Sequence, residues 1–378
     1  MKDEARNILA RYDLCDSCLG RQFAALSTGL TNRQRGASLR RLVGAAPCEA
    51  TCVLCGGIFQ ADLDRWVRMA VRQLCRVQYG TFVVGSRPGR HVADLEQQIA
   101  SYAPLDSAEA LKTEFNREVG KLLWRRTCRK VDLEHPDVLV LFDLLDGRVD
   151  LELKPLFVFG YYRKLVRTLP QTRWRKFRSS VEQVIAAPLV QATRGTAHAL
   201  HGGGREDIDV RCLGWRPFVL EISEPAKRRI HLARIERLIN RSGRVKVRSL
   251  ERTTRRRVAA VKADRHDKTY RVRVRLGRPF RTEDVERMQS MTGVIDQETP
   301  MRVVHRRTNM TRRRALKRIA CRKVAADCLD VDLTGEAGLY IKELVTGDDG
   351  RTRPSLAEVL DCKAEVLTLD VLRIHRAE

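Results

Sequence analysis

Residues 201–211 read HGGGREDIDVR, and residues 213–222 continue as LGWRPFVLEI. Three consecutive glycines allow a loop whose backbone approaches a ligand closely, and the apolar run after them predicts a buried strand. If the segment after the glycines is extended, the two-residue period of a strand places on one face Arg205, Asp207, Asp209 and Arg211. An aspartate beside such a loop is suited to act as a nucleophile or a base. Taken alone, the same residues more often form a salt-bridged strand edge.

The glycine loop lacks the Gly-Lys-Ser/Thr ending of a phosphate-binding P-loop, and the chain has no Gly-x-Gly-x-x-Gly fingerprint. These are the two short motifs by which ATP and dinucleotide sites are most readily found in a sequence. We therefore expect chemistry that uses no organic cofactor.

Strand patterns dominate the second half of the chain, which favours a mixed, mainly antiparallel sheet. The segment KTYRVRVRL, residues 268–276, alternates apolar side chains with three arginines. One face of this strand should therefore pack on a core while the other is cationic and available to a nucleic acid. Similar strand patterns occur in RPFVLEIS, VKVRSL, LYIKELV and AEVLTLDVLRI.

The charge balance indicates a polyanionic partner. The 378 residues include 72 Lys and Arg against 47 Asp and Glu, so the formal net charge is 72 − 47 = +25. Residues 302–318 alone contain eight Lys or Arg and no carboxylate. Nucleic acid is the leading partner because cationic side chains that neutralise phosphates release counterions. A membrane surface is disfavoured because the basic residues are interleaved with strand patterns instead of lying on one amphipathic helix.

Length and hydropathy place the chain among globular proteins of two to three domains, since 43% of its residues are hydrophobic. No stretch approaches the roughly 20 apolar residues of a membrane span. The first residues, MKDEARNILARYD, lack the apolar region of a secretion signal. We expect a cytoplasmic monomer, and nothing in the sequence implies a protein partner.

Four of the eleven cysteines form two Cys-x-x-Cys pairs, Cys15 with Cys18 and Cys52 with Cys55. Two such pairs match the four-thiolate pattern of a structural zinc site, and a disulfide interpretation is weak for a cytoplasmic chain. With four thiolate ligands the metal has no open position, so it should stabilise the fold and perform no chemistry. Cys48 is a possible substitute ligand.

The first half predicts a small α+β module. Apolar residues at helical spacing from Leu63 to Leu74 predict a helix, and TFVVG at 81–85 predicts a buried strand. A second helix should begin at an Asp106 N-cap. Asp146-Gly147 lies between two apolar runs, which predicts a β-hairpin. In the basic aromatic stretch FVFGYYRKLVR that follows, Tyr161, Tyr162, Arg163 and Lys164 could stack on bases and bind phosphate. Packing of the tyrosines at a domain edge would explain them equally well.

Taken together, several motifs resemble the archaeal-type tRNA pseudouridine synthase family, which isomerises uridines 54 and 55 of the TΨC arm. They run collinearly from about Leu14 to Leu372 and comprise the Cys-x-x-Cys pairs, PLFVFGYYRKLVRTLPQTRW, HGGGREDIDVR, DKTYRVRV, QETPMRVVHRR and YIKELVTGDDGRTRPS. The resemblance implies an α+β protein with a zinc-knuckle region at 1–60, a THUMP-like RNA-binding module at 61–168 and a pseudouridine synthase domain at 169–378.

The resemblance also implies roles for individual residues. Asp207 in Arg-Glu-Asp resembles the catalytic aspartate, which acts at C1′ of a flipped uridine. Substrate-binding roles fall on Arg205, Tyr270, Tyr340, Ile341 and Lys342, with Leu344 as the alternative to Ile341 for apolar support. Arg205 or Lys342 would orient the carboxylate, while Tyr270 stacks on the base. The metal ligands would be the four paired cysteines, with one structural zinc, and the partner would be tRNA.

Two features depart from the family pattern: the loop HGGG, where a bulkier residue is expected before the last glycine, and Trp215, where smaller polar residues are usual. They concern loop mobility and substrate tolerance. Other functions remain open at this point. A THUMP-bearing tRNA methyltransferase or thiolation enzyme would need a glycine-rich turn, or an ATP loop with a reactive cysteine, and neither is found. A noncatalytic zinc-containing tRNA-binding or chaperone protein would satisfy the charge and the cysteines without Asp207.

Overall fold

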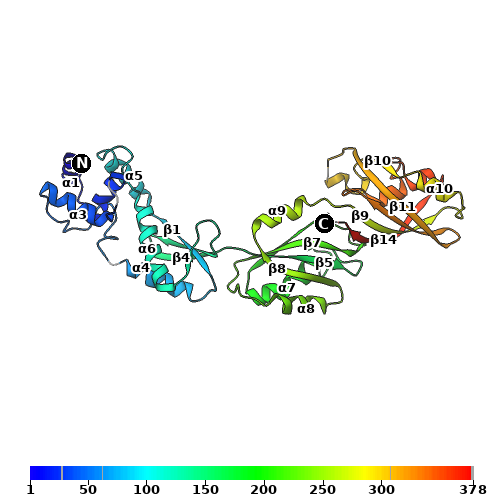
Figure 1. The fold of residues 1–378 in the computed structure, drawn as a ribbon, viewed down its shortest axis with the longest axis horizontal. Helices are drawn as coiled ribbons and strands as arrows, with labels where there is room; N and C mark the ends of the chain where they lie inside the picture. The colour runs from blue at the N-terminus through cyan, green and yellow to red at the C-terminus, as the bar shows by residue number, and fades with distance from the viewer. Residues whose placement is uncertain (27–28, 62, 307, 376–378) are drawn as a thin grey trace. The chain divides into compact units, whose positions relative to one another are not determined.

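The computed structural model describes all residues except 27–28, 62, 307 and 376–378. The chain divides into two compact units (Figure 1). Unit 1 comprises Met1–Pro155 and Glu224–Arg229, and unit 2 comprises Leu156–Ser223 and Ile230–Glu378. Among the described residues, every helix falls short of the length and hydropathy that a membrane span requires.

Unit 1 joins a helical segment to a small sheet. The helical segment holds α1 (Lys2–Leu9), α2 (Asp16–Gly20), the 3₁₀ helix η1 (Arg21–Leu26) and α3 (Asn32–Val43). Gly20 of α2 and Gly36 of α3 let these helices approach closely, because a Cβ on either glycine would lie 1.8 Å from a backbone oxygen of the other helix. This contact fixes the position of α2, which carries Cys18.

The sheet of unit 1 has the strand order β2-β1-β3-β4, with β1 parallel to both β2 and β3. Trp66, Phe115 and Phe142 meet edge to face between the helices and this sheet. The elements are α4 (Asp64–Leu74), β1 (Thr81–Arg87), α5 (Arg90–Ala100), α6 (Leu111–Thr127), β2 (Lys130–Val131), β3 (Val138–Asp143) and β4 (Arg148–Leu153).

Most sequence predictions for unit 1 are confirmed. The helix predicted from Leu63 is α4, the strand at 81–85 is β1, and Asp146-Gly147 joins β3 to β4 as an antiparallel hairpin. The Asp106 N-cap is wrong. The helix begins at Leu111 after an Ala110 cap, and Asp106 has a φ of 54° in the turn before it.

Unit 2 is built on a ten-stranded mixed sheet with the order β13-β10-β11-β12-β9-β14-β7-β5-β8, and β6 also pairs with β7. In the described part of the chain its pairings are antiparallel, apart from β14 beside β7. The predicted mixed, mainly antiparallel sheet is therefore confirmed. The strands are β5 (Leu156–Lys164), β6 (Ala197–Gly202), β7 (Arg211–Ser223), β8 (Val245–Thr253), β9 (Lys268–Leu276), β10 (Gly293–Gln297), β11 (Arg312–Ala325), β12 (Cys328–Gly335), β13 (Thr352–Arg353) and β14 (Ala364–Ile374).

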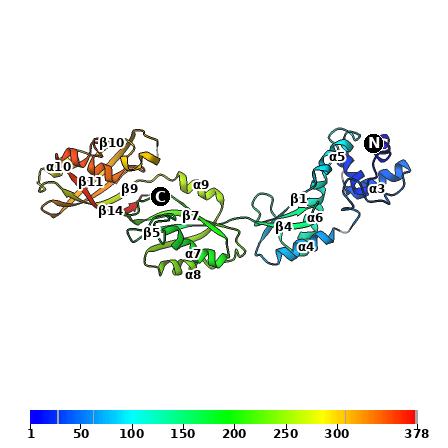
Figure 2. The ribbon, with the colours of Figure 1, turned by 180° about the vertical axis from the view of Figure 1, so that it is seen from behind.

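Helices cover this sheet in separate places. Apolar side chains of α7 (Val181–Thr193) and α8 (Leu232–Asn240) pack on one face of β5, β7 and β8, and α9 (Arg255–Ala263) packs on the opposite face (Figures 1 and 2). A second core joins β9, β11, β12 and β14 to three short helices, α10 (Asp284–Gln289), α11 (Ile341–Thr346) and α12 (Leu356–Val359). The 3₁₀ helix η2 spans Met301–Arg306.

Two predictions for unit 2 need correction. The domain boundary expected between residues 168 and 169 lies instead at Pro155–Leu156, because β5 pairs along its length with β7 and β8 of unit 2. LYIKELV does not form a strand, since residues 341–346 are helix α11. Its apolar residues satisfy helical spacing as well as strand spacing, and sequence alone does not separate the two in so short a run. The division of the first 155 residues at residue 60 stays a prediction.

Candidate active site and metal centre

The four paired cysteines meet in unit 1. Their sulfur atoms all lie within 4.8 Å of one another, and all four residues are buried. The Sγ atoms of Cys15 and Cys55 are 3.8 Å apart. Tetrahedral thiolate ligands about 2.3 Å from a zinc ion would be separated by about 3.8 Å. The donor set and its spacing therefore fit a metal ion with four sulfur ligands.

A buried arginine supports this cluster. Nη2 of Arg21 lies 3.1 Å from Sγ of Cys18, and the Arg21 side chain is fully buried. Nη1 of Arg21 also lies 3.6 Å from a carboxylate oxygen of Glu114. A guanidinium in this position offsets the negative charge that four thiolates bring into the interior. Cys48 lies outside the cluster, and its Sγ donates to the carbonyl oxygen of Ala50.

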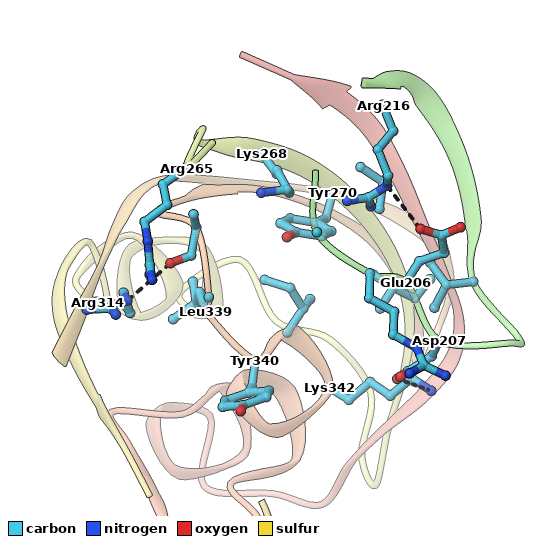
Figure 3. Close-up of a pocket in the computed structure, with 18 of the residues that line it drawn as sticks. Glu206, Asp207, Arg216, Arg265, Lys268, Tyr270, Arg314, Leu339, Tyr340 and Lys342 are labelled. Carbon is cyan, nitrogen blue, oxygen red and sulfur yellow. Dashed lines mark hydrogen bonds and ion pairs between the residues drawn. The ribbon is translucent and has the colours of Figure 1, made fainter. Parts of the chain in front are cut away.

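A cavity with a volume of about 500 Å³ lies in unit 2. This volume is within the range of about 300–1,000 Å³ usual for small-molecule sites. Its wall combines three kinds of side chain, and Figure 3 shows most of them arranged around it. They are the carboxylates Glu206 and Asp207, the aromatic residues Tyr270 and Tyr340, and a basic group that includes Arg265, Lys268, Arg312, Arg314 and Lys342.

The loop that carries Asp207 joins β6 to β7, and its glycines are required by close contacts. Gly204 has a φ of 91°, and a Cβ there would lie 2.7 Å from Nη1 of Arg216. A Cβ on Gly203 would lie 2.7 Å from the ring of Pro217. The expectation of an extended segment after the glycines is wrong. The chain turns at residues 207–210, where the Val210 N–H donates to the carbonyl oxygen of Asp207.

The buried Glu206 side chain anchors this loop to the protein interior. Its side chain and that of Arg216 are each 1% exposed, and Nε of Arg216 lies 3.0 Å from the Glu206 carboxylate. The Tyr162 hydroxyl donates to the same carboxylate over 3.0 Å, and Nη1 of Arg216 donates to the carbonyl oxygen of Gly203. Burial raises the pKa of Tyr162 well above its usual value, so the hydroxyl keeps the proton that it donates.

Lys164 holds the next part of the loop. Its Nζ donates to the carbonyl oxygens of Leu169, Asp207 and Ile208 over 2.8–3.0 Å. Burial lowers the pKa of this lysine. Tyr162 and Lys164 were expected to contact RNA, but both are fully buried. They are part of the scaffold that positions Asp207.

The Asp207 side chain emerges from this scaffold into the cavity and is 39% exposed. Nη1 of Arg302 lies 3.0 Å and Nζ of Lys342 lies 3.4 Å from its Oδ2. Lys342 also donates to Asp209 over 2.8 Å. Arg302 is fixed in turn by the Glu343 carboxylate, 2.6 Å from its Nε. Two cations thus hold one carboxylate oxygen of Asp207 at the cavity wall.

The two tyrosines come from different elements. Tyr270 lies on β9, is 9% exposed and has a pKa raised to about 12 by burial, so its phenol is protonated at neutral pH. Tyr340 caps α11, and Gln297 holds its backbone by accepting from its N–H and donating to its carbonyl oxygen. Ile341 lines the cavity as the predicted apolar support, whereas the alternative, Leu344, is buried in the core.

Opposite Asp207 the cavity wall is basic (Figure 3). Lys268 begins β9, and its pKa falls to about 8 because burial and the nearby Arg216 charge disfavour the ammonium form. Arg265 follows α9, and Arg314 on β11 donates from Nε to the carbonyl oxygen of Ala337. A ligand in this cavity would meet a carboxylate on one side and cations on the other.

The predicted cationic face of β9 is neutralised within the sheet. Arg271 makes two hydrogen bonds of 2.8 Å to Asp332, and Arg273 pairs with Asp330 of the same neighbouring strand. Arg275 lies 3.8 Å from Glu365 on β14. Each arginine of this face therefore lies beside a carboxylate of β12 or β14, so the face carries less net positive charge than the alternation alone predicts. That the face binds a nucleic acid stays a prediction.

The sequence analysis assigned five residues to one site, and the structure places all of them at one cavity: Asp207, Tyr270, Tyr340, Ile341 and Lys342. It expected Arg205 or Lys342 beside Asp207. Arg205 is exposed at the cavity mouth, and the cations near the carboxylate are Lys342 and Arg302. Arg302 was missed because it is one of eight basic residues in a run without a distinguishing neighbour. The Glu206–Arg216 pair was missed because only the fold brings its members together.

Two family profiles match the chain: one described as "Pus10, C-terminal" over residues 157–375 and one described as "Pus10 THUMP domain, archaeal" over residues 66–143. Three curated relatives carry the name tRNA pseudouridine synthase Pus10. The protein from Methanothrix thermoacetophila is 35% identical, covering 98% of this chain and 93% of its own length. That of Pyrococcus furiosus is 36% identical, covering 98% and 97%, and that of Archaeoglobus fulgidus is 38% identical, covering 88% and 97%.

The first profile spans the strands, loop and helix that build the Asp207 cavity, and the second spans three of the four strands of the unit 1 sheet, β1, β2 and β3. The relatives align over nearly the whole chain at more than one residue in three. The resemblance expected from the sequence is confirmed: this chain belongs to the Pus10 family of tRNA pseudouridine synthases.

Proposed function

We propose that this enzyme converts uridine to pseudouridine in the TΨC arm of tRNA, at position 54, at position 55 or at both, with Asp207 as the catalytic carboxylate. The observation that carries the proposal is the placement of Asp207 at the wall of a cavity of about 500 Å³, paired with Arg302 and Lys342 and accompanied by two tyrosines. The family relatives named tRNA pseudouridine synthase support tRNA as the substrate.

The reaction requires that the uridine leave its stack. A base inside a folded tRNA arm does not reach a cavity wall, and extrusion of a nucleotide costs about a few kcal/mol. The basic wall formed by Arg265, Lys268 and Arg314 offsets this cost by facing the phosphates that accompany the flipped nucleotide. Tyr270 and Tyr340 then hold the uracil ring by stacking.

Asp207 acts at the ribose of the flipped uridine. Its carboxylate either attacks C1′ or serves as the base in a route through a glycal, and in both cases the C1′–N1 bond breaks. The released uracil turns within the cavity, a C1′–C5 bond forms, and the proton on C5 is replaced by one on N1. The product is an isomer of the substrate, so no cofactor is consumed. Arg302 and Lys342 orient the carboxylate, and the protonated Tyr270 phenol serves as a hydrogen-bond donor.

For unit 1 we propose that the four-cysteine cluster holds one structural zinc ion. The donor set, its burial and the 3.8 Å separation of two sulfurs suit zinc. Four thiolates fill the tetrahedral coordination of a structural zinc ion. Cys15, Cys18, Cys52 and Cys55 would be the ligands. The site would stabilise unit 1 and leave the chemistry to unit 2.

The decisive experiment uses a tRNA transcript labelled with tritium at C5 of uridine. Conversion to pseudouridine releases the C5 tritium to water, and a binding protein releases none. Transcripts in which cytidine replaces uridine 54, uridine 55 or both would identify the position. If both uridines are modified, each single replacement should lower the release by about half. If only one is modified, replacing that uridine should abolish the release. The double replacement should abolish it in either case. Release that is unchanged with the double replacement would contradict the assignment to the TΨC arm.

A further inference from the structure

Three arginines of unit 2 are held against aromatic rings instead of carboxylates. The guanidinium carbons of Arg163 and Arg248 lie 4.3 and 4.4 Å from the centroid of the Trp215 ring. The guanidinium carbon of Arg257 lies 4.3 Å from the centroid of Phe159. Arg248 also lies 5.6 Å from the Tyr161 centroid. These are cation–π distances, which fix the plane of a guanidinium while leaving its charge intact.

The three arginines belong to one side of the sheet. Tyr162 of β5 is buried under α7 and α8, so the alternation of the strand turns Phe159, Tyr161 and Arg163 to the other face. Helix α9 covers the Phe159 end of that face with Val258 and Val261. Arg163, Trp215 and Arg248 lie on three adjacent strands, β5, β7 and β8. We call Arg163, Arg248 and Arg257 the aromatic-backed arginines.

Their surroundings differ from those of the β9 arginines. Arg271, Arg273 and Arg275 each pair with a carboxylate. Among the described residues, the aromatic-backed arginines form no ion pair, and Arg248 and Arg257 are exposed. A stacked guanidinium keeps the N–H groups on its edge for another acceptor. An anion would therefore meet donors here that are already oriented and not neutralised.

Helix α9 runs from this surface toward the cavity. Helix α9 carries Arg257 near its start, and Lys262, Asp264 and Arg265 at its end line the cavity wall. Arg257 and Lys262 are five residues apart, which is about 7.5 Å along a helix. That rise equals about two nucleotide steps of a duplex strand at about 3.4 Å each. An RNA strand whose nucleotide occupies the cavity would thus bring its next phosphates near Arg257, one of the aromatic-backed arginines.

We propose that the aromatic-backed arginines form a binding surface for the phosphate backbone of the substrate RNA, next to the nucleotide that enters the cavity. Trp215, Tyr161 and Phe159 are positioning residues that hold the guanidinium planes. The inference rests on the proposed function for the identity of the RNA. The binding it describes does not require turnover, so it is measured separately.

The test is RNA affinity as a function of salt for the full-length protein and an unlabelled tRNA transcript. Arg248→Gln and Arg257→Gln should each weaken binding about fivefold and reduce the slope of log affinity against log salt by about one unit, as loss of a phosphate contact does. Arg271→Gln is the matched control from the neutralised face, and it should leave the slope unchanged. Trp215→Leu should weaken binding, and Trp215→Phe should restore most of it because an aromatic ring remains.

Three results would overturn the proposal: slopes unchanged in both Arg248→Gln and Arg257→Gln, a slope reduced equally by Arg271→Gln, or a Trp215→Leu variant with a lower melting temperature but wild-type affinity. Failure of the proposed function looks different. In that case the wild-type protein would release no tritium, yet it would still bind tRNA with the slope that Arg248→Gln and Arg257→Gln reduce.

Discussion

Each unit of this protein has a buried arginine at its candidate site, and the two arginines differ in what they contact. In unit 1, Arg21 lies 3.1 Å from Sγ of Cys18, so it touches the cluster itself. In unit 2, Arg216 pairs with Glu206, the residue before Asp207 in the chain. The cysteine cluster is closed, with all four residues buried, whereas Asp207 is 39% exposed at a cavity.

The two sites show that a buried charge can either contact a cluster directly or fix the loop next to an exposed carboxylate. Four buried thiols would complete the coordination sphere of a metal ion and leave no position for a substrate. At the Asp207 loop the buried charges are satisfied by Glu206, Arg216 and Tyr162, and the next residue along the chain is turned toward the cavity. Neighbouring carboxylates thus differ in position: Glu206 fixes the loop in the interior, and Asp207 faces the cavity.

The largest effect should follow removal of the metal ligands. Cys15→Ser combined with Cys55→Ser should reduce bound zinc from about one per chain to none. The cooperative unfolding of unit 1 should be lost, because structural zinc contributes about 10–16 kcal/mol in small zinc domains. Metal content by mass spectrometry and calorimetry measure both. Cys48→Ser is the matched control and should keep the zinc, and zinc that is retained by the double variant would contradict the metal assignment.

Breaking the support under the Asp207 loop should cost less. Glu206→Gln leaves the Arg216 charge in the interior without its carboxylate, and loss of one member of a buried pair costs about 3–5 kcal/mol of unfolding free energy. Denaturant titration measures this loss. Glu365→Gln, which removes the carboxylate from an exposed pair with Arg275, should change stability by less than about 1 kcal/mol. Equal costs for the two variants would show that burial of the Glu206–Arg216 pair has no energetic role.

A cation beside Asp207 should affect the rate and leave stability alone. Lys342→Met removes the ammonium that is shared by Asp207 and Asp209 and should slow turnover about 10- to 100-fold, or about 1.4–2.7 kcal/mol in the barrier. Single-turnover tritium release measures the rate. Because the Lys342 side chain is 24% exposed, its loss should move the melting temperature little. A large fall in melting temperature with an unchanged rate would move Lys342 from the site to the scaffold.

The smallest effect should come from one hydroxyl. Tyr162→Phe removes the O–H that donates to Glu206 and accepts from Gln171, at a cost of about 1–2 kcal/mol in unfolding free energy. The turnover rate should stay within a few-fold of wild type, because Arg216 still pairs with Glu206. A variant that is as stable as wild type would show that this hydrogen bond contributes nothing net to the anchor.

Much of this architecture could be predicted from sequence because strand alternation, helical spacing and cysteine spacing are each set by residues close together in the chain. The alternation in KTYRVRVRL predicts β9, and the spacing of two Cys-x-x-Cys pairs predicts the cluster that the structure brings together. The short helix α11 was assigned as a strand because LYIKELV fits either period. The boundary of unit 2 was misplaced because β5 belongs to this unit through its pairing with β7 and β8. The sequence of β5 alone does not reveal which strands it pairs with.

The functional groups divide in the same way. Asp207, Tyr270 and Lys342 were found through motifs, whereas Arg302 and the Glu206–Arg216 pair depend on contacts between distant segments. The arginines give the sharpest lesson. Alternation made the β9 set look free, but Asp330 and Asp332 on the neighbouring strand neutralise it. Whether an arginine is available depends on the facing strand, which the pattern of its own strand does not reveal.

The most direct test of the account compares two aspartates that lie two residues apart and share Lys342. Asp207→Asn and Asp209→Asn each remove one carboxylate charge with little change in shape. The measurement is single-turnover tritium release at saturating protein, together with tRNA affinity. Asp207→Asn should lower the rate by at least about a thousandfold and keep wild-type affinity, whereas Asp209→Asn should stay within about tenfold of the wild-type rate. An Asp207→Asn variant that releases tritium as fast as Asp209→Asn would contradict the central role of Asp207.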